Sequence, residues 1–106
     1  MAREFEAGRP NRAPTHPGAI LRETVFPTLR MSVADAAAHL GVTRQTLHRI
    51  LAERTAVTPE MAVRLGKFCG NGAALWLRMQ QAYDLWNASE KLKEEVKRIP
   101  TVRDAA

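Results

Sequence analysis

The segment that most constrains the fold of this chain spans residues 32–51 and reads SVADAAAHLGVTRQTLHRIL. It predicts two short helices joined by a tight turn at Gly41, because glycine readily takes the left-handed backbone conformation that ends a helix. Ser32 and Thr43 precede the two helices and suit the N-cap position. Two helices can pack this closely only if their inner positions are apolar and mostly small, and the sequence supplies such a set: Ala34, Ala37, Leu40, Val42, Leu47 and Ile50.

The outer positions of the second predicted helix are polar or basic: Arg44, Gln45, Thr46, His48 and Arg49. In a helix-turn-helix, the second helix lies in the DNA major groove and its N-terminal residues reach base edges. Arg44 is suited to a bidentate pair with guanine and Gln45 to one with adenine. Arg49 lies on about the same face and is suited to a base or a phosphate. This pattern predicts a DNA-binding helix-turn-helix.

A second group of residues in and beside this helix is suited to the DNA backbone: Thr43, Thr46, His48 and Arg54. The competing interpretation is an ordinary solvated helix face, which carries the same residue types. The glycine turn, the alanine-rich first helix and the flanking helices favour DNA binding over that interpretation.

The flanking sequence predicts an all-α fold of about five helices, of which the last is long. A first helix begins at His16-Pro17-Gly18 and is ended or distorted by Pro27, which has no N–H to donate. The Thr58-Pro59-Glu60 triplet begins another helix, because it offers a capping hydroxyl, a proline in the first turn and an acid near the helix N-terminus.

The last helix begins near Ala73 and is expected to run to about Arg98 before Pro100. The predicted organisation is a flexible arm over 1–15, a helix-turn-helix domain over 16–88 and a charged helical extension and tail over 89–106. Trp76 is expected in the core. Tyr83 and Trp86 lie farther along the same helix and are equally suited to the core and to a dimer or partner interface.

Composition narrows the class of protein. The 106 residues suit one domain, and a net charge of +5 favours a polyanionic partner, nucleic acid above all. A single cysteine, Cys69, excludes an internal disulfide, and no apolar run approaches the roughly 20 residues of a membrane span. We therefore expect a cytoplasmic protein.

No catalytic constellation stands out in the sequence. The three histidines, His16, His39 and His48, are far apart, and one cysteine gives no zinc-ligand pattern. Cys69 is more typical of a small buried residue than of a nucleophile. The expectation is a protein that is not an enzyme, with no metal and no cofactor.

Three stretches, read in order, resemble the HigA family of antitoxins within the phage-repressor-like helix-turn-helix superfamily. They are HPGAILRE (16–23), GVTRQTLHRIL (41–51) and TPEMAVRLGKFCGNGAALWLRMQQAYDLW (58–86). The family usually has glycine or a small residue where this chain has Arg30, and often a polar residue at Val33. The second departure removes one backbone or base contact from the start of the first motif helix.

The resemblance implies a compact bundle of about five helices, like that of the lambda repressor, and two linked roles. One is neutralisation of a HigB-type toxin, a messenger-RNA endonuclease, and the other is repression of the toxin–antitoxin operon by a dimer bound to operator DNA. A stand-alone transcriptional regulator has the same DNA-binding residues and remains an alternative. A protein-binding module without DNA binding is a second alternative, against which Arg44, Gln45 and Arg49 argue.

Overall fold

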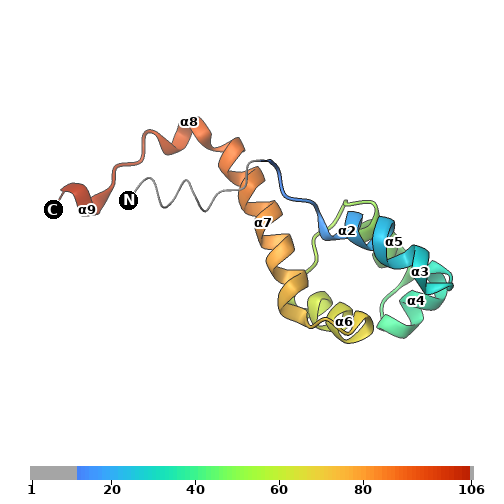
Figure 1. The fold of residues 1–106 in the computed structure, drawn as a ribbon. Helices are drawn as coiled ribbons and strands as arrows, with labels where there is room; N and C mark the ends of the chain where they lie inside the picture. Colours follow the sequence, from blue (N-terminus) through green and yellow to red (C-terminus); the bar gives the residue numbers. More distant parts are fainter. Residues whose placement is uncertain (1–11, 106) are drawn as a thin grey trace.

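The computed structural model describes residues 12–105, and every regular element within them is helical (Figure 1). The elements in chain order are α2 (Pro17–Ile20), the π-helix η1 (Leu21–Val25), α3 (Phe26–Leu29), α4 (Val33–Leu40), α5 (Arg44–Leu51), α6 (Pro59–Cys69), α7 (Ala73–Lys91), α8 (Lys93–Val96) and α9 (Val102–Ala105). This confirms the all-α fold with a helix-turn-helix and a long later helix. The arm predicted over 1–15 falls largely on residues 1–11, which lie outside the described range.

Caps predicted from the sequence begin and end α4 and begin α6. The Ser32 hydroxyl accepts the Asp35 N–H at 3.0 Å at the start of α4. Gly41 ends α4 in the left-handed conformation, with φ 74° and ψ 30°. At the start of α6 the Thr58 hydroxyl accepts the Met61 N–H at 3.2 Å. Each cap satisfies a backbone group that the helix itself leaves unpaired, so short helices can begin and end at defined residues.

One hydrophobic cluster joins the helices from η1 to α7. Its largest fully buried side chains include Trp76, Leu21, Leu47, Ile50 and Leu65. Trp76 is in the core, as expected, and its indole N–H donates to Asn71 Oδ1 at 2.8 Å.

The prediction that Ala34 faces inward is wrong, because Ala34 is exposed while Ala36 and Ala37 are buried. The inner face of α4 follows positions 33, 36, 37 and 40, the usual spacing of a buried helical stripe. Ala34 lies roughly a third of a turn away from that stripe. The sequence alone does not show which alanines are buried, because α4 carries alanine on both its exposed and its buried face.

Pro27 distorts the first helix rather than ending it. The chain continues from α2 through the π-turn of η1 into α3, where Pro27 occupies the first turn. A proline has no N–H for the carbonyl one turn earlier, and its ring crowds that carbonyl. A wider π-turn just upstream accommodates both effects.

Two buried polar side chains each accept a backbone N–H, and neither contact was predicted. His16 is 3% exposed, and its Nδ1 accepts the Gly18 N–H at 2.9 Å, so the imidazole is the N-cap of α2. Gln80 is also 3% exposed, and its Oε1 accepts the Val57 N–H at 2.8 Å. Gln80 therefore holds the loop that follows α5 against α7.

The helix expected to run to Arg98 ends at Lys91, and α8 follows as a separate short helix. The stripe of Leu92, Val96 and Ile99 is 43%, 52% and 66% exposed, so this part receives no packing energy from the bundle. The radius of gyration is 17.3 Å, against about 13 Å for a compact chain of this length. Figure 1 shows why: α7 leaves the bundle and carries α8 and α9 away from it. Among the described helices, none is both long and apolar enough to cross a bilayer.

Candidate nucleic-acid interface

Two threonines fix the first turn of α5. The Thr43 hydroxyl oxygen accepts the Thr46 N–H at 3.0 Å and donates its own hydrogen to Thr46 Oγ1 at 2.9 Å. A hydroxyl has one hydrogen, so Thr43 has none left for a ligand whereas Thr46 retains its own. The two candidate phosphate contacts therefore differ in their hydrogen bonds. Thr43 holds the start of the helix, whereas half-buried Thr46 keeps a hydroxyl donor for a ligand.

Four longer side chains project from α5 into solvent: Arg44, Gln45, His48 and Arg49. Arg44 and His48 are one turn apart, as are Gln45 and Arg49, so the four form two adjacent rows on one side of the helix. Over residues 12–105, none of these side chains has a hydrogen bond or an ion pair. Their donors and acceptors face solvent, as a surface that reads DNA requires.

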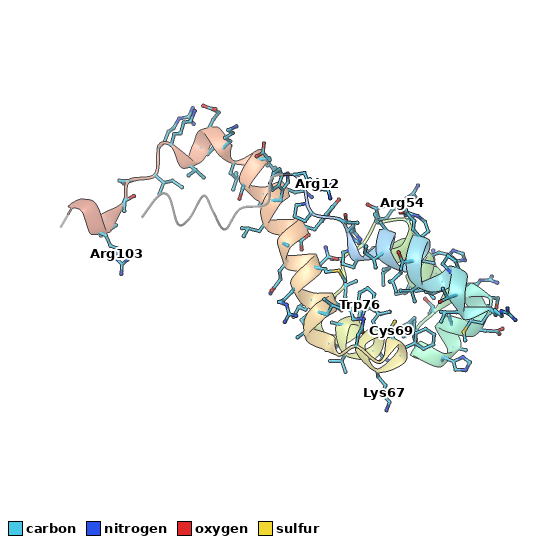
Figure 2. All side chains as sticks on the ribbon, in the orientation of Figure 1. Arg12, Arg54, Lys67, Cys69, Trp76 and Arg103 are labelled. Carbon is cyan, nitrogen blue, oxygen red and sulfur yellow. The ribbon has the colours of Figure 1, made fainter. Side chains whose placement is uncertain are left out.

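Arg54 lies just beyond α5 and is exposed. Its backbone N–H donates to the Arg49 carbonyl at 2.8 Å, so the loop turns back closely against the end of the helix. Figure 2 shows Arg54 and Lys67 on opposite sides of the bundle. The structure therefore places the predicted contact residues from Thr43 to Arg54 on one helix and the turn that follows it.

The opposite face of α5 is fixed against the bundle. Leu47 and Ile50 are 0% and 2% exposed. Gly18 of α2 lies so close to the backbone of α5 that a Cβ at this position would overlap the Ile50 carbonyl oxygen. Only glycine allows this approach without a shift of one helix, so α2 determines where α5 lies.

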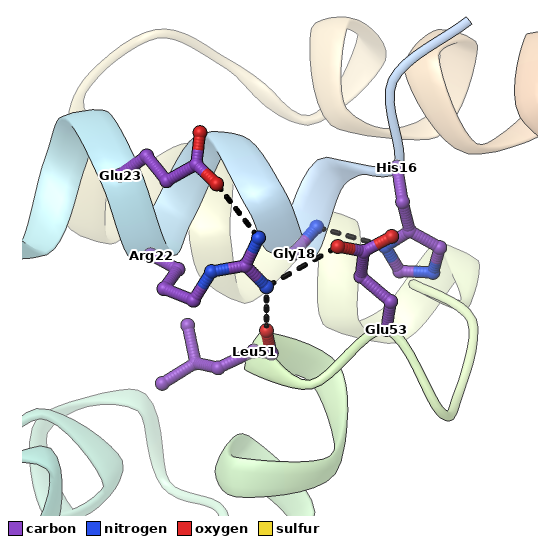
Figure 3. A network of polar contacts seen from close by, with 6 residues as sticks. All are labelled: His16, Gly18, Arg22, Glu23, Leu51 and Glu53. Atoms are coloured by element: carbon purple, nitrogen blue, oxygen red, sulfur yellow. Dashed lines mark hydrogen bonds and ion pairs between the residues drawn. The ribbon is translucent and has the colours of Figure 1, made fainter. Parts of the chain in front are cut away.

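Arg22 ties the end of α5 to the first helices, as Figure 3 shows. Its Nη1 donates to the Leu51 carbonyl at 2.7 Å and to Glu53 Oε2 at 3.2 Å, while Nη2 donates to Glu23 Oε2 at 2.8 Å. The hydrogen bonds to Glu23 and then to Glu53 raise the pKa of Arg22. A cation at a helix C-terminus also interacts favourably with the helix dipole. No local sequence pattern predicts this clamp, because Leu51 is 29 residues away from Arg22 along the chain.

Arg64 of α6 has a similar role at the motif turn. Its Nη1 donates to the Leu40 carbonyl at 2.8 Å, at the end of α4. A Cβ at Gly41 would lie 2.7 Å from the same Nη1, so a larger residue here would displace the Arg64 guanidinium in addition to straining the left-handed backbone. The turn between α4 and α5 is therefore held from α6.

The remaining titratable residues form no metal centre. Among the described residues, no group of three or more His, Cys, Asp or Glu side chains is placed to hold a metal ion. His39 is exposed, and its Nδ1 lies 2.8 Å from the Asp35 carbonyl oxygen of its own helix. Cys69 is half-buried, and desolvation raises the pKa of its thiol, which makes it a weak nucleophile at neutral pH.

Tyr83 and Trp86 do not join the α5 surface. They lie on α7, and both are half-buried. The Tyr83 ring meets His16 edge-on, with ring centroids 4.8 Å apart and planes at 81°. This contact accounts for part of the burial of Tyr83 within the chain.

Comparison with known proteins is consistent with the geometry of α4 and α5. A family model described as helix-turn-helix matches residues 29–76. YbaQ, an uncharacterized HTH-type transcriptional regulator of Escherichia coli, is 34% identical over 88% of this chain and 84% of its own length. The antitoxin HigA of Pseudomonas aeruginosa, solved with the higBA promoter, is 30% identical with a TM-score of 0.77, over 83% of this chain and 96% of that chain. The chain belongs to the HigA family of helix-turn-helix proteins. The antitoxin GraA, solved in complex with its operator, is 34% identical with a TM-score of 0.78, over 88% of this chain and 94% of that chain.

The structure explains one departure from the HigA pattern and describes the other. Arg30 ends α3 with φ 53° and ψ 38°, a left-handed conformation in which glycine is the least strained residue. Glycine at this position would therefore be less strained than Arg30. Val33 is half-buried at the start of α4 and packs against the core, so this chain has an apolar contact where a polar side chain is common.

Proposed function

We propose that the protein is the antitoxin of a type II toxin–antitoxin pair. In this role it neutralises a HigB-type messenger-RNA endonuclease and represses its own operon as a dimer bound to operator DNA. The observation that carries the proposal is the outer face of α5, where four polar side chains have no partner among the described residues. The HigA and GraA structures with promoter and operator DNA support it. This role needs no cofactor or catalytic group, and it places the protein in the cytoplasm.

Operator reading follows from the order of residues along α5. The N-terminal part of the helix enters the major groove, where the Arg44 guanidinium pairs with guanine O6 and N7 and the Gln45 amide pairs with adenine N6 and N7. Arg49 lies one turn after Gln45, within reach of a base edge or a phosphate. These contacts supply sequence specificity, because base edges differ between base pairs and phosphates do not.

Backbone contacts hold α5 at a fixed depth and register in the groove. Thr46 and His48 are suited to donate to phosphate oxygens beside the helix, and Arg54 is suited to a phosphate from the following loop. Thr43 contributes by holding the first turn of the helix. Such contacts make affinity strongly dependent on salt, since each neutralised phosphate releases condensed counterions.

Dimerisation is assigned to the outer part of α7. Tyr83 and Trp86 are half-buried there, and Leu85 on the same helix is 69% exposed. Large apolar side chains on a helix that leaves the bundle favour contact with a second copy of the chain. A symmetric dimer places its two recognition helices about one DNA turn apart, roughly 34 Å, and so requires a palindromic operator.

Co-expression with the neighbouring gene tests the toxin half of the proposal. The expected result is that a small basic protein encoded next to this chain arrests growth alone, and that co-expression of this chain restores growth and co-purifies both proteins. A neighbour that is harmless, or that stays toxic and does not co-purify, would contradict an antitoxin role.

The second candidate is a stand-alone regulator without a toxin, favoured by the similarity to YbaQ. It predicts the same DNA binding as the antitoxin role, and a negative co-expression result together with operator binding would select it.

A further inference from the structure

A second polar surface lies directly beside the outer face of α5. A hollow of about 360 Å³ opens between α5 and the first turns of α6. The rest of its lining is apolar, but six polar residues also line it: Thr46, Arg49, Thr55, Thr58, Glu60 and Arg64. The sequence pattern did not predict that these residues lie together, because they come from a helix, a loop and the next helix.

The charges and hydrogen-bond donors of the hollow favour an anion. Arg49 and Arg64 bring two positive charges against the one negative charge of Glu60. Arg64 uses one N–H on the Leu40 carbonyl, and a guanidinium has five. The Thr58 hydroxyl oxygen accepts the Met61 N–H, so its hydrogen remains available. No hydrogen bond of the Thr55 side chain occurs within residues 12–105.

The position of the hollow identifies the anion. Thr46 and Arg49 belong both to its lining and to the proposed DNA-reading helix, so the two surfaces are continuous. When a helix lies in the major groove, the phosphates of one strand pass along its flank. A phosphodiester is singly charged and presents oxygen acceptors, which matches a lining of guanidinium and hydroxyl donors.

We propose that the hollow between α5 and α6 binds a backbone phosphate of the operator, with Thr55 and Arg64 as DNA contacts in addition to those on α5. This inference rests on the proposed function, since it concerns the same DNA. Arg64 also holds the Leu40 carbonyl at 2.8 Å. A phosphate on Arg64 is therefore fixed relative to the turn that begins α5, and this fixes the register of the recognition helix on the duplex.

The test measures binding to DNA from the chain's own promoter by fluorescence anisotropy over a series of salt concentrations. Thr55→Glu introduces a carboxylate into the hollow and is expected to weaken binding roughly tenfold or more. In the control Thr55→Gln, the glutamine side chain has nearly the same size as glutamate but no charge. The affinity of this variant for the promoter DNA is expected to stay within about threefold of wild type.

Two further pairs of variants report on charge in the hollow. Glu60→Gln removes the negative charge and is expected to tighten binding about three- to fivefold, whereas Glu95→Gln on exposed α8 leaves it unchanged. Arg64→Gln is expected to reduce the slope of log K against log salt by about 0.9, the contribution of one phosphate, whereas Lys67→Gln on the same helix does not. Circular dichroism identifies any variant that fails to fold. The two Thr55 variants leave the Arg64–Leu40 hydrogen bond intact, so their effect on binding is separate from the loss of that contact.

The outcomes separate this inference from the proposed function. If wild type binds its promoter DNA and the Thr55 and Glu60 variants behave like their controls, the hollow is not a phosphate site and the antitoxin proposal stands. If wild type does not bind its promoter DNA, the proposed function fails and this inference fails with it. The phosphate site is supported if Thr55→Glu binds more weakly while Thr55→Gln does not, and if Glu60→Gln binds more tightly.

Discussion

At the scale of the residue, two groups of arginines stand out among the described residues in and around the helix-turn-helix. Arg22 and Arg64 each donate to the carbonyl at the end of a motif helix, Leu51 and Leu40 respectively. Arg44 and others on the outer face of α5 have no partner among the described residues. The first group holds the motif in place, although Arg64 keeps further N–H groups for a ligand, and the second group faces solvent with all of its donors available.

Arg30 provides a stability prediction at this scale. A non-glycine residue in the left-handed conformation destabilises the folded state by about 1–2 kcal/mol. Glycine avoids this strain, but its greater freedom in the unfolded chain lowers the net gain in stability. Arg30→Gly is therefore expected to raise the free energy of unfolding by about 0.5–1 kcal/mol in urea titrations followed by tryptophan fluorescence. Arg30→Ala retains the strain and should bring no gain. An unchanged or lower stability for the glycine variant would show that the Arg30 side chain stabilises the fold in another way.

At the scale of the element, the sequence predicted what local chemistry determines and missed what distant contacts determine. Ser32, Gly41 and Thr58 were identified as caps, because a cap depends on residues within one helical turn. The Gln80–Val57 hydrogen bond joins residues 23 apart, and no short motif encodes it. The length of α7 was overestimated for a related reason: helical spacing continues to Ile99, but only tertiary contacts keep such a helix continuous.

The candidate site follows the same division. Its outward residues were predicted because the spacing of Arg44, Gln45 and Arg49 is local to one helix. The clamp by Arg22 and the hollow beside α6 were missed because their residues meet only in the folded chain.

The packing of α2 on α5 gives a prediction at the scale of the element. In Gly18→Ala the new Cβ overlaps the Ile50 carbonyl, so α5 has to shift. We expect a loss of about 1–3 kcal/mol in unfolding free energy, the usual cost of overpacking, and weaker operator binding by the fraction that still folds. Gly70→Ala is the matched control, because its Cβ would meet no atom within 4 Å and only backbone strain at φ 79° opposes it. Normal operator affinity in Gly18→Ala would contradict the role of α2 in placing the recognition helix.

At the scale of the whole molecule, the chain has a bundle and a helical projection. The extents of 56 × 23 × 23 Å describe a rod, longer than one small core requires. The projection carries apolar side chains that no described part of the chain covers, with Ile99 at 66% and Val102 at 79% exposure. A protomer of this shape is suited to assembly through its projection, which leaves α5 free for DNA.

Trp86→Ala tests that assembly. If the outer part of α7 is the dimer interface, the variant should sediment as a monomer in analytical ultracentrifugation at concentrations where wild type is a dimer. Large aromatic side chains contribute the most to such interfaces, often 2 kcal/mol or more on truncation. Leu75→Ala, near the start of α7, should remain dimeric. A dimeric Trp86→Ala protein would place the interface on another surface.

The most direct test of the central claim is operator binding by a protein that carries both Arg44→Ala and Gln45→Ala. Each lost base contact should cost about 1–3 kcal/mol on specific DNA, so the double variant should bind its own promoter at least tenfold more weakly than wild type in mobility-shift titrations. A control with the same residue types, Arg78→Ala with Gln81→Ala on the exposed side of α7, should bind like wild type. Unchanged promoter binding by the Arg44 and Gln45 variant would show that α5 is not the recognition helix.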